Sequence, residues 1–167
     1  RLAHRQGQPL DRGSDLFRRL RREILAALLL DVESPTYRDF VLPRLMTADE
    51  AGLVDAFIGF CHTNCAHAQA ENYTFEDVVR AFHFRPEMSL RLVRLFKTRF
   101  DPDLADREAA WASELEQVER EVASHATGHR MLDDFRRSLF RAALLFVKHC
   151  LKTNFFVEEK QALAFRL

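Results

Sequence analysis

Apolar residues recur at helical spacing along most of the chain, and each run begins at a recognisable start signal. Ser14 predicts the N-cap of a first helix. Its apolar stripe is Leu16, Leu20, Ile24 and Leu28. Pro35 fits the first position of a short helix that we expect to end near Pro43. A capping box at 47–50, a capping threonine at Thr74 and Pro86 predict three further helix starts.

The clearest pattern comes after Asp106. One stripe steps by four, three and four residues, through Trp111, Leu115, Val118 and Val122. A second steps by three and four, through Leu132, Phe135, Leu139, Ala142 and Phe146. The turn at 126–129 contains Gly128, so the two stripes predict an antiparallel αα-hairpin. We expect Phe135, Leu139 and Phe146 to face Leu115, Val118 and Val122 across it.

The last residues change period. Leu163, Phe165 and Leu167 alternate with other positions, which predicts a β-strand. A single strand is not stable alone, so we expect its sheet partners beyond Leu167. The predicted fold is an all-α, multi-helix bundle with a long C-terminal αα-hairpin, ending in one β-strand of the next domain. We expect a flexible lead-in at 1–13, a helical domain at 14–156 and the start of a following catalytic domain at 157–167.

Composition narrows the class of protein. The 167 residues fit one domain, and only 5 Gly and 5 Pro favour long helices over many turns. Since 25 basic residues balance 25 acidic ones, we expect no nucleic-acid partner. The longest apolar run, Ile24 to Leu30, is too short to span a membrane. Three Cys favour a reducing, cytoplasmic location. The chain opens at Arg1 without a leader segment, so we expect a piece of a longer polypeptide.

Candidate chemistry is sparse. One cluster suggests a site for a soft metal ion, formed by Cys61, His62, Cys65 and His67. No second Cys/His pair has a matching spacing, so the favoured interpretation is buried cysteines and surface histidines. The arginines at 18, 19, 21 and 22 suit the solvated face of a helix. The five glycines cannot form a dinucleotide fingerprint, a P-loop or a nucleophile elbow. We therefore predict no catalytic, cofactor-binding or metal-binding residue.

Three stretches resemble one family, in the right order, over about residues 75–167. Phe84 to Met88 and Leu95 to Pro102 resemble the "LF-x-x-RFDP" region of the large NAD-dependent glutamate dehydrogenases. The helix, turn and helix of Leu115 to Asp134 are similar to the next segment of those enzymes. His149 to Phe156 and Lys160 to Leu167 resemble the junction that leads into their catalytic domain.

The resemblance implies a parent oxidoreductase of amino-acid catabolism that converts L-glutamate, NAD and water to 2-oxoglutarate, ammonium and NADH. Its NAD site and catalytic lysines match nothing in this chain. Lys152, Thr153 and Asn154 are the motif residues present, and we expect them to fix the turn from helix to strand. The expected partners are the catalytic domain of the same polypeptide and further copies in a homo-oligomer. A metabolite-sensing regulatory module of that enzyme and an unrelated helical interaction domain stay open as alternatives.

Overall fold

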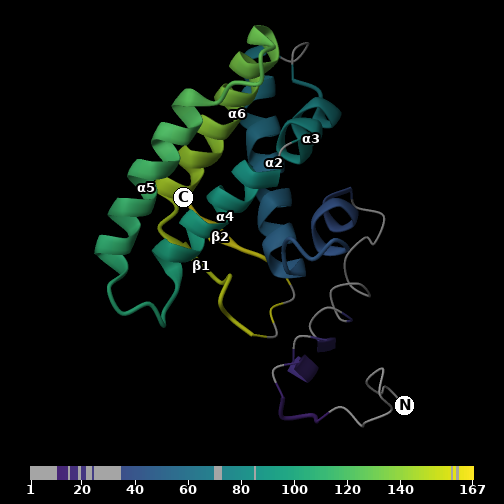
Figure 1. The fold of residues 1–167 in the computed structure, drawn as a ribbon, viewed down its shortest axis with the longest axis vertical. Coiled ribbons are helices and arrows are strands. Elements are labelled where there is room, and N and C mark those ends of the chain that lie inside the picture. Colours follow the sequence, from purple (N-terminus) through teal and green to yellow (C-terminus); the bar gives the residue numbers. More distant parts are fainter. Residues whose placement is uncertain are drawn as a thin grey trace.

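A computed structural model of the chain describes residues 11–14, 16–18, 20–21, 24, 35–69, 73–84, 86–158, 160 and 162–167, without the side chains of 66–69. Its elements are the π-helix η1 (Tyr37–Val41), α2 (Ala48–Gln69), α3 (Phe75–Phe84), α4 (Pro86–Phe100), α5 (Arg107–Ser124), α6 (Arg130–His149), β1 (Lys152–Thr153) and β2 (Phe165–Arg166). Figure 1 shows the helices side by side and the strands at one end of α6. The all-α fold with a terminal strand is confirmed.

The predicted helix starts carry the expected caps. The Thr47 N–H donates to Glu50 Oε2 at 2.9 Å, and the Glu50 N–H donates to Thr47 Oγ1 at 3.3 Å. The Asp77 N–H donates to Thr74 Oγ1 at 3.2 Å, and the Phe17 N–H donates to Ser14 Oγ at 3.2 Å. Each hydroxyl satisfies an N–H that a first helical turn leaves without a partner, which is why these short sequence signals are reliable.

The first apolar stripe is not buried where the structure describes it. Leu16 and Ile24 are 53% and 38% exposed, and Leu20 is half-buried. A stripe of this kind is expected to face the interior, and Ile24 does not. Periodicity identifies an apolar face without identifying a neighbour that covers it. Leu28 and most of the lead-in at 1–13 lie outside the described residues.

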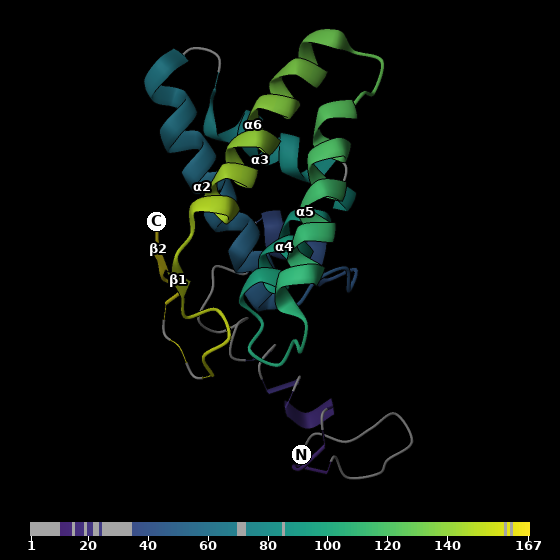
Figure 2. The ribbon, with the colours of Figure 1, turned by 90° about the vertical axis from the view of Figure 1, so that its left-hand side faces the viewer.

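The core forms where α2, α4 and α6 meet, with α3 and α5 packed on the outside (Figures 1 and 2). Fully buried phenylalanines fill it, notably Phe57, Phe82, Phe96 and Phe140. They meet edge to face, as Phe82 and Phe140 do at 5.5 Å between ring centroids. This arrangement brings the positive edge of one ring to the negative face of another. None of the described helices combines the length and apolar character needed to cross a membrane.

The predicted α5–α6 hairpin is confirmed, and a carboxylate fixes its turn. The Thr127 N–H and hydroxyl donate to Asp133 at 2.8 and 2.6 Å. These bonds, with one from the Gly128 N–H, hold the pKa of Asp133 below its usual value. Gly128 itself has φ +92°, a conformation that other residues rarely adopt.

The expected facing of the hairpin is only partly correct. Leu139, Phe146, Val118 and Val122 are buried. Phe146, however, packs on two rings of α2, Phe57 and Phe60, at 5.5 and 5.0 Å. Phe135 stacks on Tyr73 at 5.1 Å, in the segment before α3, and Leu132 is 50% exposed. Because α6 contacts α2, α3, α4 and α5, it buries several faces, and α5 packs most extensively on α4.

The terminal strand has a partner inside the chain. β2 pairs antiparallel with β1, in the register Lys152 to Arg166 and Thr153 to Phe165. The expectation that its first partner lies beyond Leu167 is therefore wrong. A strand of two residues is too short to show a period-two pattern, so β1 has no periodicity signal in the sequence.

Candidate functional site

The resemblance is most specific at Lys152, Thr153 and Asn154, and these residues begin the β1–β2 hairpin. α6 ends at His149, and Cys150 is its C-cap. Lys152 and Thr153 form β1, and Asn154 is the next residue. The three residues therefore lie at the connection between the helical core and the hairpin.

The side chain of Asn154 clamps the two arms of the hairpin together. Its Nδ2 donates to the Ala162 carbonyl at 2.8 Å, and its Oδ1 accepts from the Ala164 N–H at 2.7 Å. An amide presents one donor group and one acceptor on the same plane, so it can replace a stretch of strand pairing. Among the described residues other than glycine only Arg44 has a positive φ, so Asn154 acts here through its side chain.

Thr153 and Lys152 have local roles. Thr153 Oγ1 accepts a hydrogen bond from the Phe155 N–H at 3.1 Å, which turns the chain after β1. The Lys152 carbonyl accepts the S–H of Cys150 at 3.4 Å, while the lysine itself is exposed. Burial raises the pKa of the Cys150 thiol, which keeps it protonated. Nothing in this geometry activates a nucleophile or a base.

Aromatic side chains seat the hairpin on the helical core. Phe155 packs edge-on against Phe96 of α4 at 5.6 Å between ring centroids. Phe165 of β2 packs against Phe96 at 5.9 Å and against Phe146 of α6 at 4.9 Å. Such pairs contribute about 0.5–1.5 kcal/mol each beyond the burial of their area. The hairpin is thus part of the core rather than an appendage.

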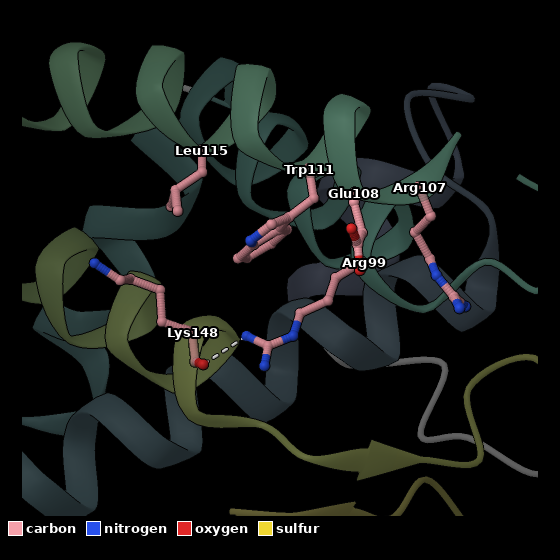
Figure 3. A pocket seen from close by; sticks show the side chains of 6 residues that line it. All are labelled: Arg99, Arg107, Glu108, Trp111, Leu115 and Lys148. Atoms are coloured by element: carbon pink, nitrogen blue, oxygen red, sulfur yellow. Dashed lines mark hydrogen bonds between the residues drawn. The ribbon is translucent and has the colours of Figure 1, made fainter. Parts of the chain in front are cut away.

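Arg99 fixes the end of α6, from which the hairpin starts. Its Nη1 donates to the Val147 carbonyl at 2.7 Å. It also donates to the Lys148 carbonyl at 2.5 Å (Figure 3). The guanidinium also lies over the ring of Trp111, 5.0 Å from its centroid. The last carbonyls of a helix have no partner within the helix, so a cation there satisfies them and suits the helix dipole.

The loop of the hairpin is tied to the start of α2. Lys160 forms an ion pair with Asp49 at 2.9 Å, and its ammonium lies 5.7 Å from the ring centroid of Phe155. Both ends of the hairpin therefore contact the helical core.

The outer side of the junction exposes apolar side chains. Leu151, Val157 and Leu167 are 59%, 55% and 54% exposed. A two-stranded sheet also leaves hydrogen-bonding groups open on its outer edges. Leu151 and Leu167 adjoin through the pairing of β1 and β2, so this end of the hairpin exposes two neighbouring apolar side chains beside an open strand edge.

The Cys/His cluster does not converge on a metal position. Cys61 is fully buried and donates its S–H to the Leu139 carbonyl at 3.4 Å, and burial raises the pKa of its thiol. Cys65 is half-buried, and His62 packs edge-on against Phe75. In the part of the chain that the structure describes, no group of three or more His, Cys, Asp or Glu side chains could hold a metal ion. The side chain of His67 lies outside that part.

The remaining polar motifs take places at the surface or at helix ends. Arg18 and Arg21 are exposed, as expected for a solvated face. His125 and His129 occupy the C-cap of α5 and the N-cap of α6. Asn72, which begins a glycosylation sequon, lies outside the described residues.

One polar cluster has no counterpart in the sequence patterns. Thr36 Oγ1 lies 2.5 Å from Asp55 Oδ1 and 3.1 Å from His83 Nε2, and His83 Nδ1 lies 2.8 Å from Asp39 Oδ2. The order carboxylate, imidazole and hydroxyl is that of a hydrolase triad. Thr36 is only 1% exposed, however, so its hydroxyl cannot meet a substrate. The cluster instead ties η1 to α2 and α3.

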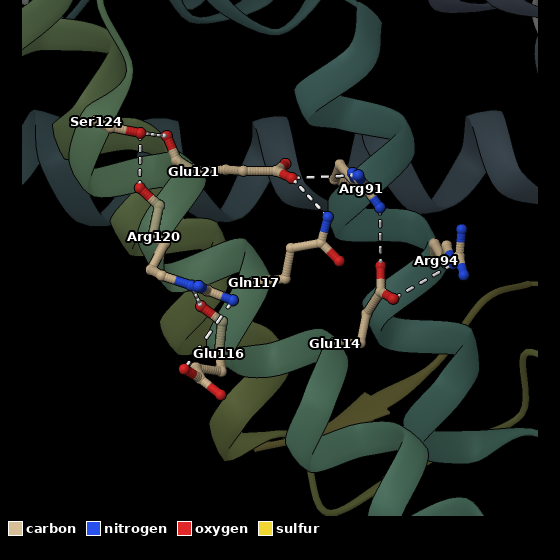
Figure 4. A network of polar contacts seen from close by, with 8 residues as sticks. All are labelled: Arg91, Arg94, Glu114, Glu116, Gln117, Arg120, Glu121 and Ser124. Atoms are coloured by element: carbon tan, nitrogen blue, oxygen red, sulfur yellow. Dashed lines mark hydrogen bonds and ion pairs between the residues drawn. The ribbon is translucent and has the colours of Figure 1, made fainter.

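A second cluster explains the one buried glutamate of α5. Glu114 pairs with Arg91 Nη1 and with Arg94 Nε of α4, both at 3.4 Å (Figure 4). Arg91 also reaches Glu121 at 3.1 Å, and Gln117 donates to Glu121 at 3.0 Å. The carboxylate is shared by two arginines of the neighbouring helix, so this cluster joins α4 to α5.

Comparison with protein-family models, curated proteins and solved structures finds no match for this chain.

Proposed function

We propose that this chain is a non-catalytic helical domain of a large NAD-dependent glutamate dehydrogenase, placed immediately before the catalytic domain. One observation carries the proposal. The residues that most resemble the family, Lys152 to Asn154 and Lys160 to Leu167, form a hairpin that is clamped by Asn154 and seated on the aromatic core. A motif whose residues make defined structural contacts supports a family assignment better than sequence similarity alone.

In this proposal the parent enzyme oxidises L-glutamate with NAD in the cytoplasm, as an oligomer of identical chains. Hydride leaves the α-carbon of glutamate for NAD, and water then hydrolyses the imine to 2-oxoglutarate and ammonium. Those steps belong to the catalytic domain. The contribution of this chain is to present a junction surface that includes Leu151 and Leu167, against which that domain packs.

The rigidity of the junction has a physical basis. The hairpin is anchored by Phe165 on the core, by Asn154 across its arms and by Arg99 at the end of α6. Three anchors of different chemistry leave no single hinge. A domain packed on this surface is held at a fixed angle to the helices, which suits an inter-domain support.

The sequence of the encoding gene beyond Leu167 is the first test. We expect a glycine-rich dinucleotide fingerprint within a few hundred residues. We also expect glutamate-dependent NAD reduction by the whole polypeptide, and neither activity nor NAD binding by this chain alone. A gene that continues without such a fingerprint would refute the proposal, as would calorimetry showing a micromolar NAD site on this chain.

A further inference from the structure

The ends of α4 and α6 and the first turns of α5 line a shallow, open pocket of about 390 Å³ (Figure 3). Arg99, Arg107, Glu108, Trp111, Leu115 and Lys148 line it. This volume lies in the range of small-molecule sites. One wall is apolar, made by Trp111 and Leu115, and the remaining lining is charged.

The charge of the lining is positive. Arg99, Arg107 and Lys148 oppose the single carboxylate of Glu108, so three positive charges against one leave a formal charge of +2. Lys148 also pairs with Glu119 at 2.9 Å. Even when Lys148 is discounted for that pair, one net positive charge remains. A concave surface with an excess of one sign concentrates ions of the opposite sign.

Arg99 is the best-fixed cation of the pocket. Its Nη1 is held by two carbonyls of α6 and its plane lies over Trp111. No carboxylate among the described residues forms an ion pair with it. A guanidinium has five N–H donors, so the bonds from Nη1 leave the donors of Nη2 and Nε for a further acceptor. A preorganised guanidinium of this kind suits the planar oxygens of a carboxylate or phosphate.

The start of α5 adds to the positive potential. Asp106 is the N-cap, and its side chain makes no capping hydrogen bond. The N–H groups of the first turn, at Arg107 and Glu108, therefore lack a side-chain cap. The N-terminus of a helix carries a partial positive charge and favours an anion. This end supplements the arginines and is not needed to define the pocket.

We propose that the pocket binds a small anion that carries an apolar ring. Its phosphate or carboxylate group lies against Arg99, its ring lies against Trp111 and Leu115, and Arg107 adds to the positive potential at the edge of the pocket. Each part of this assignment has its own residues, so charge and ring can be tested separately. The proposal goes beyond the proposed function, because binding is measured on this chain without any enzyme activity.

Trp111 is the single tryptophan of the chain, so its fluorescence reports on this pocket alone. Phenyl phosphate is the probe that carries both charge and ring. Inorganic phosphate carries the charge alone, benzyl alcohol the ring alone, and benzoate replaces phosphate by carboxylate. We expect a saturable change in emission with phenyl phosphate or benzoate, and weaker binding of inorganic phosphate and of benzyl alcohol.

Three single-charge variants locate the site. Arg107→Gln removes an exposed cation of the pocket, and we expect weaker binding, by roughly two- to fivefold, because the positive potential falls. Glu108→Gln removes the opposing carboxylate and should tighten binding. Arg120→Gln, an exposed position of α5 outside the pocket, is the matched control and should leave affinity unchanged.

Absence of a saturable change with both ring-bearing anions would overturn the proposal. Equal affinity of the variants at positions 107 and 120 would place binding elsewhere and overturn it as well. Equal affinity for inorganic phosphate and phenyl phosphate would remove the role of Trp111 and Leu115. None of these results depends on whether the gene encodes a glutamate dehydrogenase, so failure here and failure of the proposed function are distinguishable.

Discussion

Replacing Asn154 by alanine tests how the hairpin is held. The change removes two side-chain hydrogen bonds, to the Ala162 carbonyl and from the Ala164 N–H. A hydrogen bond within a protein contributes about 0.5–1.5 kcal/mol net. Two such bonds contribute about 1–3 kcal/mol together. Asn154 is half-buried, so we expect the lower part of this summed range, about 1–2 kcal/mol. We expect this loss to appear as local opening of the hairpin.

Hydrogen exchange of the Ala164 amide is the most direct measurement, because Asn154 Oδ1 is its partner. A loss of about 1.4 kcal/mol makes exchange about tenfold faster. Asn154→Asp is the matched control. It keeps an oxygen for the Ala164 N–H, while its second oxygen replaces the donor and faces the Ala162 carbonyl. We therefore expect the Ala164 amide to exchange more slowly than in the alanine variant.

The helical core provides the internal reference. Amides of α4 and α6 should exchange at the same rate in the wild type and in both variants, because the aromatic seat of Phe155 and Phe165 is untouched. Unchanged exchange of Ala164 in the alanine variant would show that the clamp contributes nothing. Equal acceleration across α4 and α6 would show that the hairpin and the core unfold as one unit.

The remaining predictions concern the core, one ion pair and one thiol. Phe146→Ala should lower the free energy of unfolding by about 3–5 kcal/mol in urea melts, because Phe146 is buried. Phe135→Ala removes a half-buried ring from its stack, so it should lower the free energy of unfolding clearly less. Equal losses for the two variants would contradict the packing described. Burial raises the pKa of Glu50, but bonds from Lys97 and Thr47 outweigh this and lower it below its ordinary 4.5. The stabilising effect of the Glu50 carboxylate is therefore complete above about pH 4.5 and lost as the pH falls through the lowered pKa. Glu50→Gln should lower the free energy of unfolding by about 1 kcal/mol near neutral pH and leave it unchanged in acid. A difference between wild type and variant that persists in acid would refute this prediction. Cys61, buried and with a raised pKa, should resist thiol reagents in the native state and react on unfolding; rapid labelling of the native protein would show that its site is open.

The helix starts could be predicted because their signals are local. A capping hydroxyl and the N–H that it satisfies lie within three residues of each other, as at Thr47 and Thr74. The local sequence therefore contains both partners of the hydrogen bond. The turn at Gly128 is also a local signal, because its positive φ restricts the residue type at that position.

Contacts between distant segments could not be predicted in this way. Phe146 carries the same helical spacing whether it faces α5 or α2, and only the packing of several helices decides. Thr36 and His83 are far apart in the chain, and neither belongs to a motif, yet their side chains lie 3.1 Å apart. The partner strand escapes prediction for a different reason, because Lys152 and Thr153 are too few to establish a period.

For Asn154, the sequence predicts only part of the structural role that the hairpin shows. It predicts that Asn154 acts on nearby backbone, whereas the side chain reaches positions eight and ten residues later. The pocket between α4, α5 and α6 has no sequence motif, since its cations come from three helices. The role of Arg99 becomes visible only in the folded structure, where its guanidinium reaches two carbonyls of α6.

The antiparallel pairing of β1 and β2 has a geometric consequence for any change in loop length. The chain enters the hairpin at Leu151 and returns beside it, because the Leu151 N–H donates to the Arg166 carbonyl at 2.7 Å. The position of Leu167 is therefore set by β1 and the end of α6, and not by the path of the loop between Val157 and Ala162. Extra residues inserted in that loop add closure entropy that grows only with the logarithm of its length. They leave Leu167 where it was, so a longer loop can be accommodated without displacing this residue from its place beside Leu151.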